Sequence, residues 1–204
     1  AYRLDAGYRV THHGEQTMPR SGAGLVARPF VTPAPGHPVV VWEADGVKVT
    51  SFRVDHAPVD PAVGYRFDYG GRSVVVSGDT TKSANLQRVA QDVDLLVHEA
   101  LSAELVGNIT RAARVQGRAN LAKITTDILS YHATPVEAAE IARDAGAGHL
   151  LYYHVVPPLP LHPLREAFLD GVDEVYAGPV TLGVDGTFVS LPSGSEAIDV
   201  RELL

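Results

Sequence analysis

The sequence contains no cysteine, which excludes both disulfide bonds and thiolate metal ligands. It also has no apolar run that approaches the ~18 residues needed by a membrane-spanning helix. Asp and Glu outnumber Lys and Arg by 24 to 17, and no long basic block interrupts the net charge of -7. Neither a membrane partner nor non-specific nucleic-acid binding is therefore expected. The compartment, cytoplasmic or periplasmic, stays unknown.

The composition that remains is that of a folded domain. A chain of 204 residues with 45% hydrophobic and 20% charged residues fits one domain or part of a larger one. Residues 1–38 are punctuated by Gly and Pro and predict an irregular arm with little regular structure. Residues 39–204, where β-branched runs begin, are predicted to form the domain. The start has neither an initiator Met nor a signal pattern, so an upstream N-terminus is expected.

The domain pattern predicts strands that alternate with helices, an α/β layered fold. Hairpins are expected around Asp45-Gly46 and Gly70-Gly71, and a closing hairpin at 180–191 around Asp185-Gly186. A helix from Thr134 to Ala145 has an N-cap Thr, a Pro at its first position and a Gly stop. The other expected elements are helix 83–91, buried strand 94–97, a stretch with mixed helical signals at 101–130, strand 150–153 and helix 163–169.

Polar side chains with metal-binding or proton-transfer chemistry follow these strands or adjoin them. Imidazole and carboxylate are the ligands that borderline divalent ions such as zinc prefer, and loops at strand ends assemble the sites of α/β folds. The segments concerned are Asp55-His56, Ser77-Gly78-Asp79-Thr80, His98-Glu99-Ala100, Tyr131-His132-Ala133-Thr134-Pro135 and Tyr152-Tyr153-His154.

Each of these residues also has a plainer interpretation. A single His after a strand is commonly structural, and Gly78-Asp79-Thr80 is also typical of a turn or a helix cap. Glu99 and His132 could form a buried hydrogen-bonded pair without catalytic duty, or a pair in which the carboxylate holds the His for proton donation. The recurrence of the pattern at several strand ends favours the functional interpretation.

Taken in order, the segments resemble the metallo-β-lactamase fold, in the branch of tRNase Z and the arylsulfatase-like hydrolases. His56 precedes a Gly-Tyr-Arg strand, and Ser-Gly-Asp-Thr contains Asp79. His-Glu-Ala follows, His132 stands before an Ala- and Glu-rich helix, and His154 closes a strand. The resemblance implies the C-terminal portion of an αββα sandwich with mixed sheets flanked by helices.

The family's His-x-His-x-Asp-His motif occurs nowhere in this chain. The resemblance implies two zinc ions sharing Asp79, with His56 on one ion and His154 on the other. It implies that His132, oriented by Glu99, protonates or stabilises the departing oxygen. With the motif absent, residues 39–204 are expected to be the second half of a longer domain. This chain alone is then expected to bind metal poorly and to be inactive.

The first functional expectation is a metal-dependent hydrolase that cleaves a small sulfate ester or phosphodiester through a dizinc-bridging hydroxide. A tRNase Z-like RNA phosphodiesterase is the alternative. The acidic net charge and the lack of a basic, Gly-rich insertion between Arg66 and Ser77 argue against RNA. A non-catalytic binding module without a complete metal site is the remaining alternative. A homodimer is expected from the resemblance alone.

Overall fold

The computed structural model describes residues 2–18 and 28–204, which belong to two compact units, 1–31 and 32–204. The first unit contains helix α1, Tyr2–His13. The expectation of little regular structure there was wrong for this helix, because its twelve residues include one Gly and no Pro. His12 and His13 lie in its last turn. Part of the Gly- and Pro-rich stretch, residues 19–27, lies outside the described residues.

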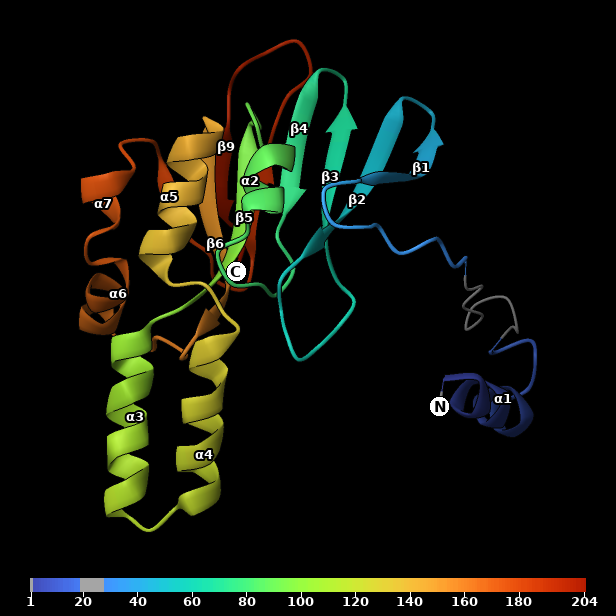
Figure 1. The fold of residues 1–204 in the computed structure, drawn as a ribbon. Helices are drawn as coiled ribbons and strands as arrows, with labels where there is room; N and C mark the ends of the chain where they lie inside the picture. Colours follow the sequence, from blue (N-terminus) through green and yellow to red (C-terminus); the bar gives the residue numbers. More distant parts are fainter. Residues whose placement is uncertain (1, 19–27) are drawn as a thin grey trace. The chain divides into compact units, whose positions relative to one another are not determined.

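Seven strands of the second unit form one mixed sheet in the order β1 to β7 (Figure 1). The pairs from β1 to β4 are antiparallel, and those from β4 to β7 are parallel. The strands are β1 Val39–Ala44, β2 Val47–Val54, β3 Ala62–Tyr69, β4 Arg72–Val76, β5 Leu95–Leu101, β6 His149–Val156 and β7 Val180–Leu182. The predicted α/β class with a mixed sheet is confirmed.

Two tight turns fix the register of the antiparallel half. Asp45 and Gly46 both have positive φ, at 52° and 79°, and Gly70 and Gly71 have φ of 56° and 77°. Two consecutive positive φ values define the hairpin turn whose twist matches the flanking strands. The two hairpins lead the chain from β1 to β2 and from β3 to β4, as predicted.

The core lies between the sheet and two helices, α2 (Ala84–Val89) and α5 (Pro135–Ala145), which Figure 1 shows over one of its faces. Phe52, Leu96 and Ile141 are fully buried in the same apolar cluster. Helix α5 begins with the capping box of Thr134 and Glu137 and ends at Gly146 in the left-handed conformation, so its predicted boundaries are confirmed. The chain then turns directly into β6.

The expected closing hairpin at 180–191 was wrong. β7 adds to the main sheet parallel to β6, whereas β8 (Thr187–Ser190) pairs with β9 (Asp199–Glu202) in a separate sheet. The Asp185-Gly186 turn does form, with the Thr187 amide donating to the Val184 carbonyl at 2.9 Å. The edge of β6 was a competing partner for β7, and a local turn signal does not reveal such a partner.

The stretch with mixed helical signals forms a helical hairpin. Helices α3 (Ala103–Val115) and α4 (Ala119–Asp127) lie side by side and project away from the sheet (Figure 1). A short 3-10 turn, Ile128–Ser130, returns the chain toward α5. Helices α6 (His162–Leu169) and α7 (Val172–Val175) follow β6. Among the described residues, no helix combines the length and apolar character needed to cross a membrane.

Candidate metal and proton-transfer site

The turn after β4 is shaped by a glycine that no other residue could replace without strain. Gly78 has φ of 65°, and a Cβ at this position would lie 2.4 Å from the carbonyl oxygen of Val63. Only glycine tolerates both conditions. The backbone therefore passes close to β3, and the next residue, Asp79, leaves the sheet at the end of β4.

Glu99 is fully buried in β5 and is held from several sides. Its Oε1 lies 3.0 Å from Nδ1 of His132 and accepts from the backbone amides of Thr80 (3.0 Å) and Ala133 (3.3 Å). Its own amide donates to the hydroxyl of Ser77 at 3.1 Å. Two segments that are distant in sequence, the turn at Thr80 and the loop at His132 and Ala133, are thus tied to one carboxylate.

The Glu99 contact determines how His132 presents its ring. An ionised carboxylate can only accept, so Nδ1 of His132 carries the hydrogen and Nε2 is the remaining nitrogen. The hydrogen bond that His132 donates to Glu99 raises the pKa of His132 and outweighs the opposing effect of burial. The expected pairing of Glu99 with His132 is therefore present in the structure.

His98, the neighbour of Glu99, has a structural role. Its Nδ1 lies 2.6 Å from the Glu99 carbonyl oxygen, and its ring is completely buried. Burial lowers the pKa of His98, which favours the neutral ring.

Asp79 and His154 face each other at the more open side of the site. Asp79 Oδ2 and His154 Nε2 lie 3.8 Å apart, and both side chains are about 40% exposed. His154 has φ of 46° and is the extra residue of a bulge, because Glu99 pairs with Tyr153 while Ala100 pairs with Val155. The bulge re-aims a side chain that a regular strand would place differently.

His56, after β2, joins the same group through His132. Its Nδ1 lies 2.8 Å from the carbonyl oxygen of Tyr131. The ring centroids of His56 and His132 are 5.2 Å apart, and those of His132 and His154 are 5.6 Å apart. The structure therefore brings all five sequence-predicted residues to one end of the sheet.

Comparison with known proteins identifies the family. Residues 4–155 match the model of the Beta-lactamase superfamily domain. The chain belongs to this superfamily. It is 36% identical over 185 residues to ribonuclease Z of Mycobacterium avium (strain 104), covering 91% of this chain and 59% of that protein. It is 34% identical over 159 residues to ribonuclease Z of Mycobacterium tuberculosis (strain ATCC 25618 / H37Rv), covering 78% of this chain and 51% of the relative.

The fold agrees with that assignment. The structure of the metallo-beta-lactamase fold protein YhfI from Bacillus subtilis superimposes with a TM-score of 0.51 at 21% identity, over 75% of this chain and 52% of that one. The expected metallo-β-lactamase fold is confirmed, and the relatives reported above are ribonucleases Z. The chain spans between about half and three fifths of the length of these curated relatives.

The superfamily implies a divalent metal, and the residues present fit one. The 3.8 Å between Asp79 and His154 exceeds a hydrogen bond, yet is shorter than two zinc-ligand bonds of ~2.0–2.2 Å placed end to end. Nδ1 of His56 contacts a backbone carbonyl oxygen. Metal-binding histidines commonly make such a contact with one ring nitrogen, and it orients the other nitrogen toward the ion.

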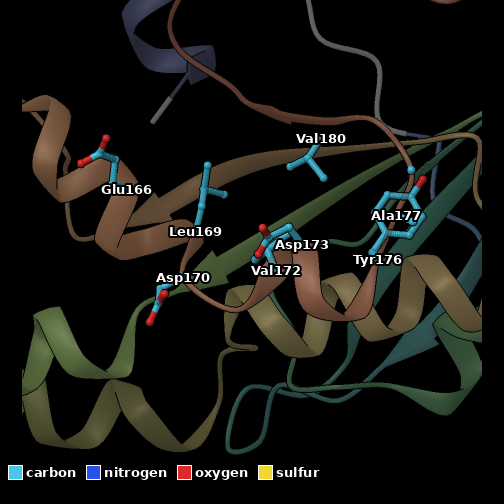
Figure 2. A pocket seen from close by; sticks show the side chains of 9 residues that line it. Glu166, Leu169, Asp170, Val172, Asp173, Tyr176, Ala177 and Val180 are labelled. Carbon is cyan, nitrogen blue, oxygen red and sulfur yellow. The ribbon is translucent and has the colours of Figure 1, made fainter.

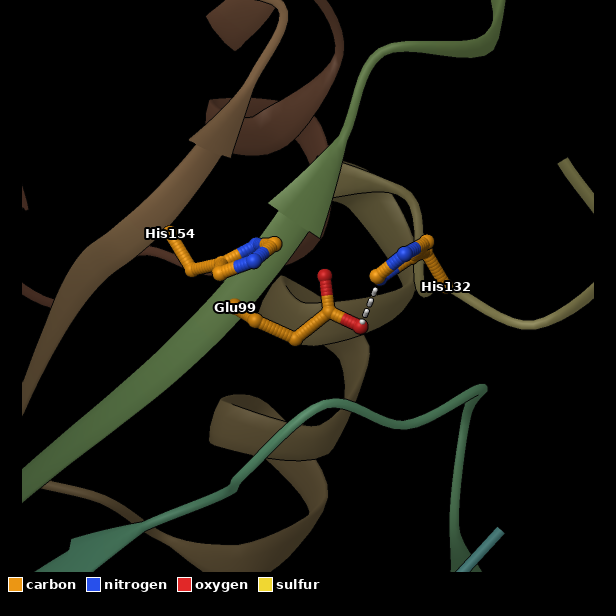
Figure 3. A group of neighbouring side chains, drawn as sticks. All are labelled: Glu99, His132 and His154. Carbon is orange, nitrogen blue, oxygen red and sulfur yellow. Dashed lines mark hydrogen bonds and ion pairs between the residues drawn. The ribbon is translucent and has the colours of Figure 1, made fainter. Parts of the chain in front are cut away.

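The most compact ligand group in the described part of the chain differs from the predicted trio. Ligand atoms of Glu99, His132 and His154 all lie within 4.8 Å of one another (Figure 3). Oε2 of Glu99 is buried without a hydrogen-bond partner. The assignment of His56, Asp79 and His154 as metal ligands therefore stays a prediction.

Some groups that build the site could not be identified from the sequence. The backbone amides of Thr80 and Ala133 and the carbonyl of Tyr131 act through the main chain, which carries no residue signature. Tyr153 is different, because it is a side chain next to His154, and burial raises its pKa. Its position one residue before His154 was its only signal.

A cavity of about 560 Å³ lies elsewhere, between α6, α7 and β7. Figure 2 shows apolar Leu169, Val172 and Val180 among its lining with carboxylates nearby. None of the five sequence-predicted residues lines it.

Proposed function

We propose that this chain belongs to a metal-dependent hydrolase that cleaves an RNA phosphodiester. The observation that carries the proposal is the 36% identity to a ribonuclease Z along 91% of the chain. These relatives favour the RNA alternative over the small sulfate ester preferred from the sequence. They also make a nucleic acid, not a small molecule, the proposed substrate.

In this proposal the chain's own residues divide the work. His56, Asp79 and His154 hold metal, here proposed as zinc, which when bound supplies Lewis acidity and a water of lowered pKa. The chain has no His-x-His-x-Asp-His segment, so these three residues are a partial ligand set.

His132 is the proposed proton donor. Its Nδ1 is committed to Glu99, so Nε2 is the nitrogen that can give a proton to the departing oxygen. Glu99 is buried and fixed by two further backbone amides, which keeps the imidazole in one orientation.

The test uses the protein as its gene encodes it, loaded with zinc, and a tRNA transcript extended at its 3′ end. His132→Gln should slow cleavage by ~10²-fold or more, since general acid catalysis contributes about that much. Asp79→Ala should lower both cleavage and bound zinc. His162→Gln is the matched control, because His162 is 81% exposed on α6. Turnover of a nitrophenyl sulfate without RNA cleavage would overturn the proposal.

A further inference from the structure

The α3–α4 hairpin leaves the domain at the candidate site and returns to it. Helix α3 begins four residues after Glu99, and the chain leaves α4 through a 3-10 turn that ends two residues before His132. At 1.5 Å per residue the thirteen residues of α3 extend roughly 20 Å. The hairpin is thus rooted between the two members of the buried pair and extends away from them (Figure 1).

The outer part of the hairpin is basic, although the chain as a whole is acidic. Residues 103–127 include four basic side chains and two acidic ones, and the acidic residues, Glu104 and Asp127, lie at the two ends of the hairpin next to the domain, against a net charge of -7 for the whole sequence. All four are exposed. They are Arg111, Arg114, Arg118 and Lys123.

Three of these cations have no acidic partner among the described residues. Arg111 donates to Asn108, and Arg114 donates to the Thr126 hydroxyl at 3.4 Å, so both contacts are with neutral groups. Only Lys123 forms an ion pair in the hairpin, with Asp127 at 2.7 Å. Arg118 lies at the tip, where α4 begins without a side-chain cap.

Three arginines lie toward the outer end of the hairpin and are called the stripe here. Arg111 and Arg114 are three residues apart on the same side of α3, and Arg118 follows in the connection to α4. Unpaired guanidinium groups in such a row suit the phosphates of a polynucleotide, which they can contact with paired N–H donors. Arg111 lies about 12 Å along α3 from the first residue of that helix. The stripe would therefore contact the RNA backbone some distance from the reacting phosphate.

We propose that the stripe of Arg111, Arg114 and Arg118 binds the phosphate backbone of the RNA whose end lies at Glu99 and His132. This inference rests on the proposed function, because it needs an RNA substrate. It also explains how an acidic chain without a basic, Gly-rich insertion after Arg66 could hold RNA: the positive charge is concentrated on the α3–α4 hairpin.

The experiment measures binding of a 3′-extended tRNA transcript to the full chain by fluorescence anisotropy over a series of salt concentrations. The triple variant R111Q/R114Q/R118Q should raise the Kd at least tenfold. The slope of log affinity against log salt should fall by roughly 2–3, because about 0.7–0.9 counterions are released per phosphate contact. The control K48Q/R165Q/R201Q removes the same charge from exposed positions elsewhere and should change the Kd less than twofold.

The outcomes separate the two proposals. If the unmodified chain binds RNA and the two triple variants bind it equally well, the proposal that the stripe binds RNA is overturned and the proposed function stands. If the unmodified chain binds no RNA, both fail. Circular dichroism checks that the hairpin triple stays folded. Sedimentation tests whether exposed Val115 and Ile124 instead pack against a second copy, and a dimer dissociated by the hairpin triple would also overturn RNA binding there.

Discussion

The two sides of the candidate site differ in how firmly they are held. Glu99 is fully buried, and its Oε1 has three contacts within 3.3 Å. Asp79 and His154 are about 40% exposed, and their contact is 3.8 Å. The pair of Glu99 and His132 therefore belongs to the folded core, whereas the pair of Asp79 and His154 is open to an added ligand. Removal of the Glu99 carboxylate should therefore lower stability, whereas removal of the Asp79 carboxylate should affect function with little change in stability.

The largest expected effect comes from removing the buried carboxylate. Glu99→Ala would leave the amides of Thr80 and Ala133 without their acceptor in a buried place, at a cost of about 3 kcal/mol in the free energy of unfolding. Asp79→Ala removes a half-exposed group and should change that free energy by no more than ~0.5 kcal/mol. Urea unfolding of both variants gives the comparison. Equal losses in the two variants would contradict the division of the site into a buried and an open side.

A second comparison uses two glycines with the same backbone conformation. Gly78 and Gly117 have φ of 65° and 68°, but a Cβ at Gly78 would lie 2.4 Å from the Val63 carbonyl, whereas nothing lies within 4 Å of one at Gly117. Gly117→Ala should cost about 1 kcal/mol for its left-handed φ alone. Gly78→Ala should cost about 2–4 kcal/mol and displace Asp79.

Urea unfolding and zinc titration together test the glycine pair. Zinc affinity should fall in Gly78→Ala and stay unchanged in Gly117→Ala. Similar unfolding costs for the two variants would show that the close approach to Val63 does not shape the Asp79 turn.

Local chemistry determined how much of this structure could be predicted from sequence. The two glycine-containing hairpins and helix α5 were predictable because turns and caps depend on a few neighbouring residues. The partner of β7 was not, since strand pairing depends on a distant edge. Within the site, the pairing of Glu99 with His132 was expected, but the bulge at His154 and the main-chain groups around Glu99 depend on tertiary packing.

The smallest expected effect compares two histidines of one strand. His149 is buried at the start of β6, with its Nε2 2.8 Å from the Thr181 hydroxyl, whereas the side chain of His154 is 42% exposed. Burial lowers the pKa of His149 in the folded state, below the ordinary 6.5. As the pH falls through 6.5, the unfolded chain takes up this proton first, so the folded state loses stability.

The loss of folding stability caused by His149 should therefore be absent above about pH 7. It should grow as the pH falls below 6.5 toward the lowered pKa. In His149→Gln the free energy of unfolding, measured in urea from pH 7.5 to 5, should fall less steeply than in the unmodified chain. His162→Gln, at an exposed position, should leave the slope unchanged. If both variants keep the original slope, the His149 ring is hydrated in the folded state, and its burial in β6 does not control its protonation.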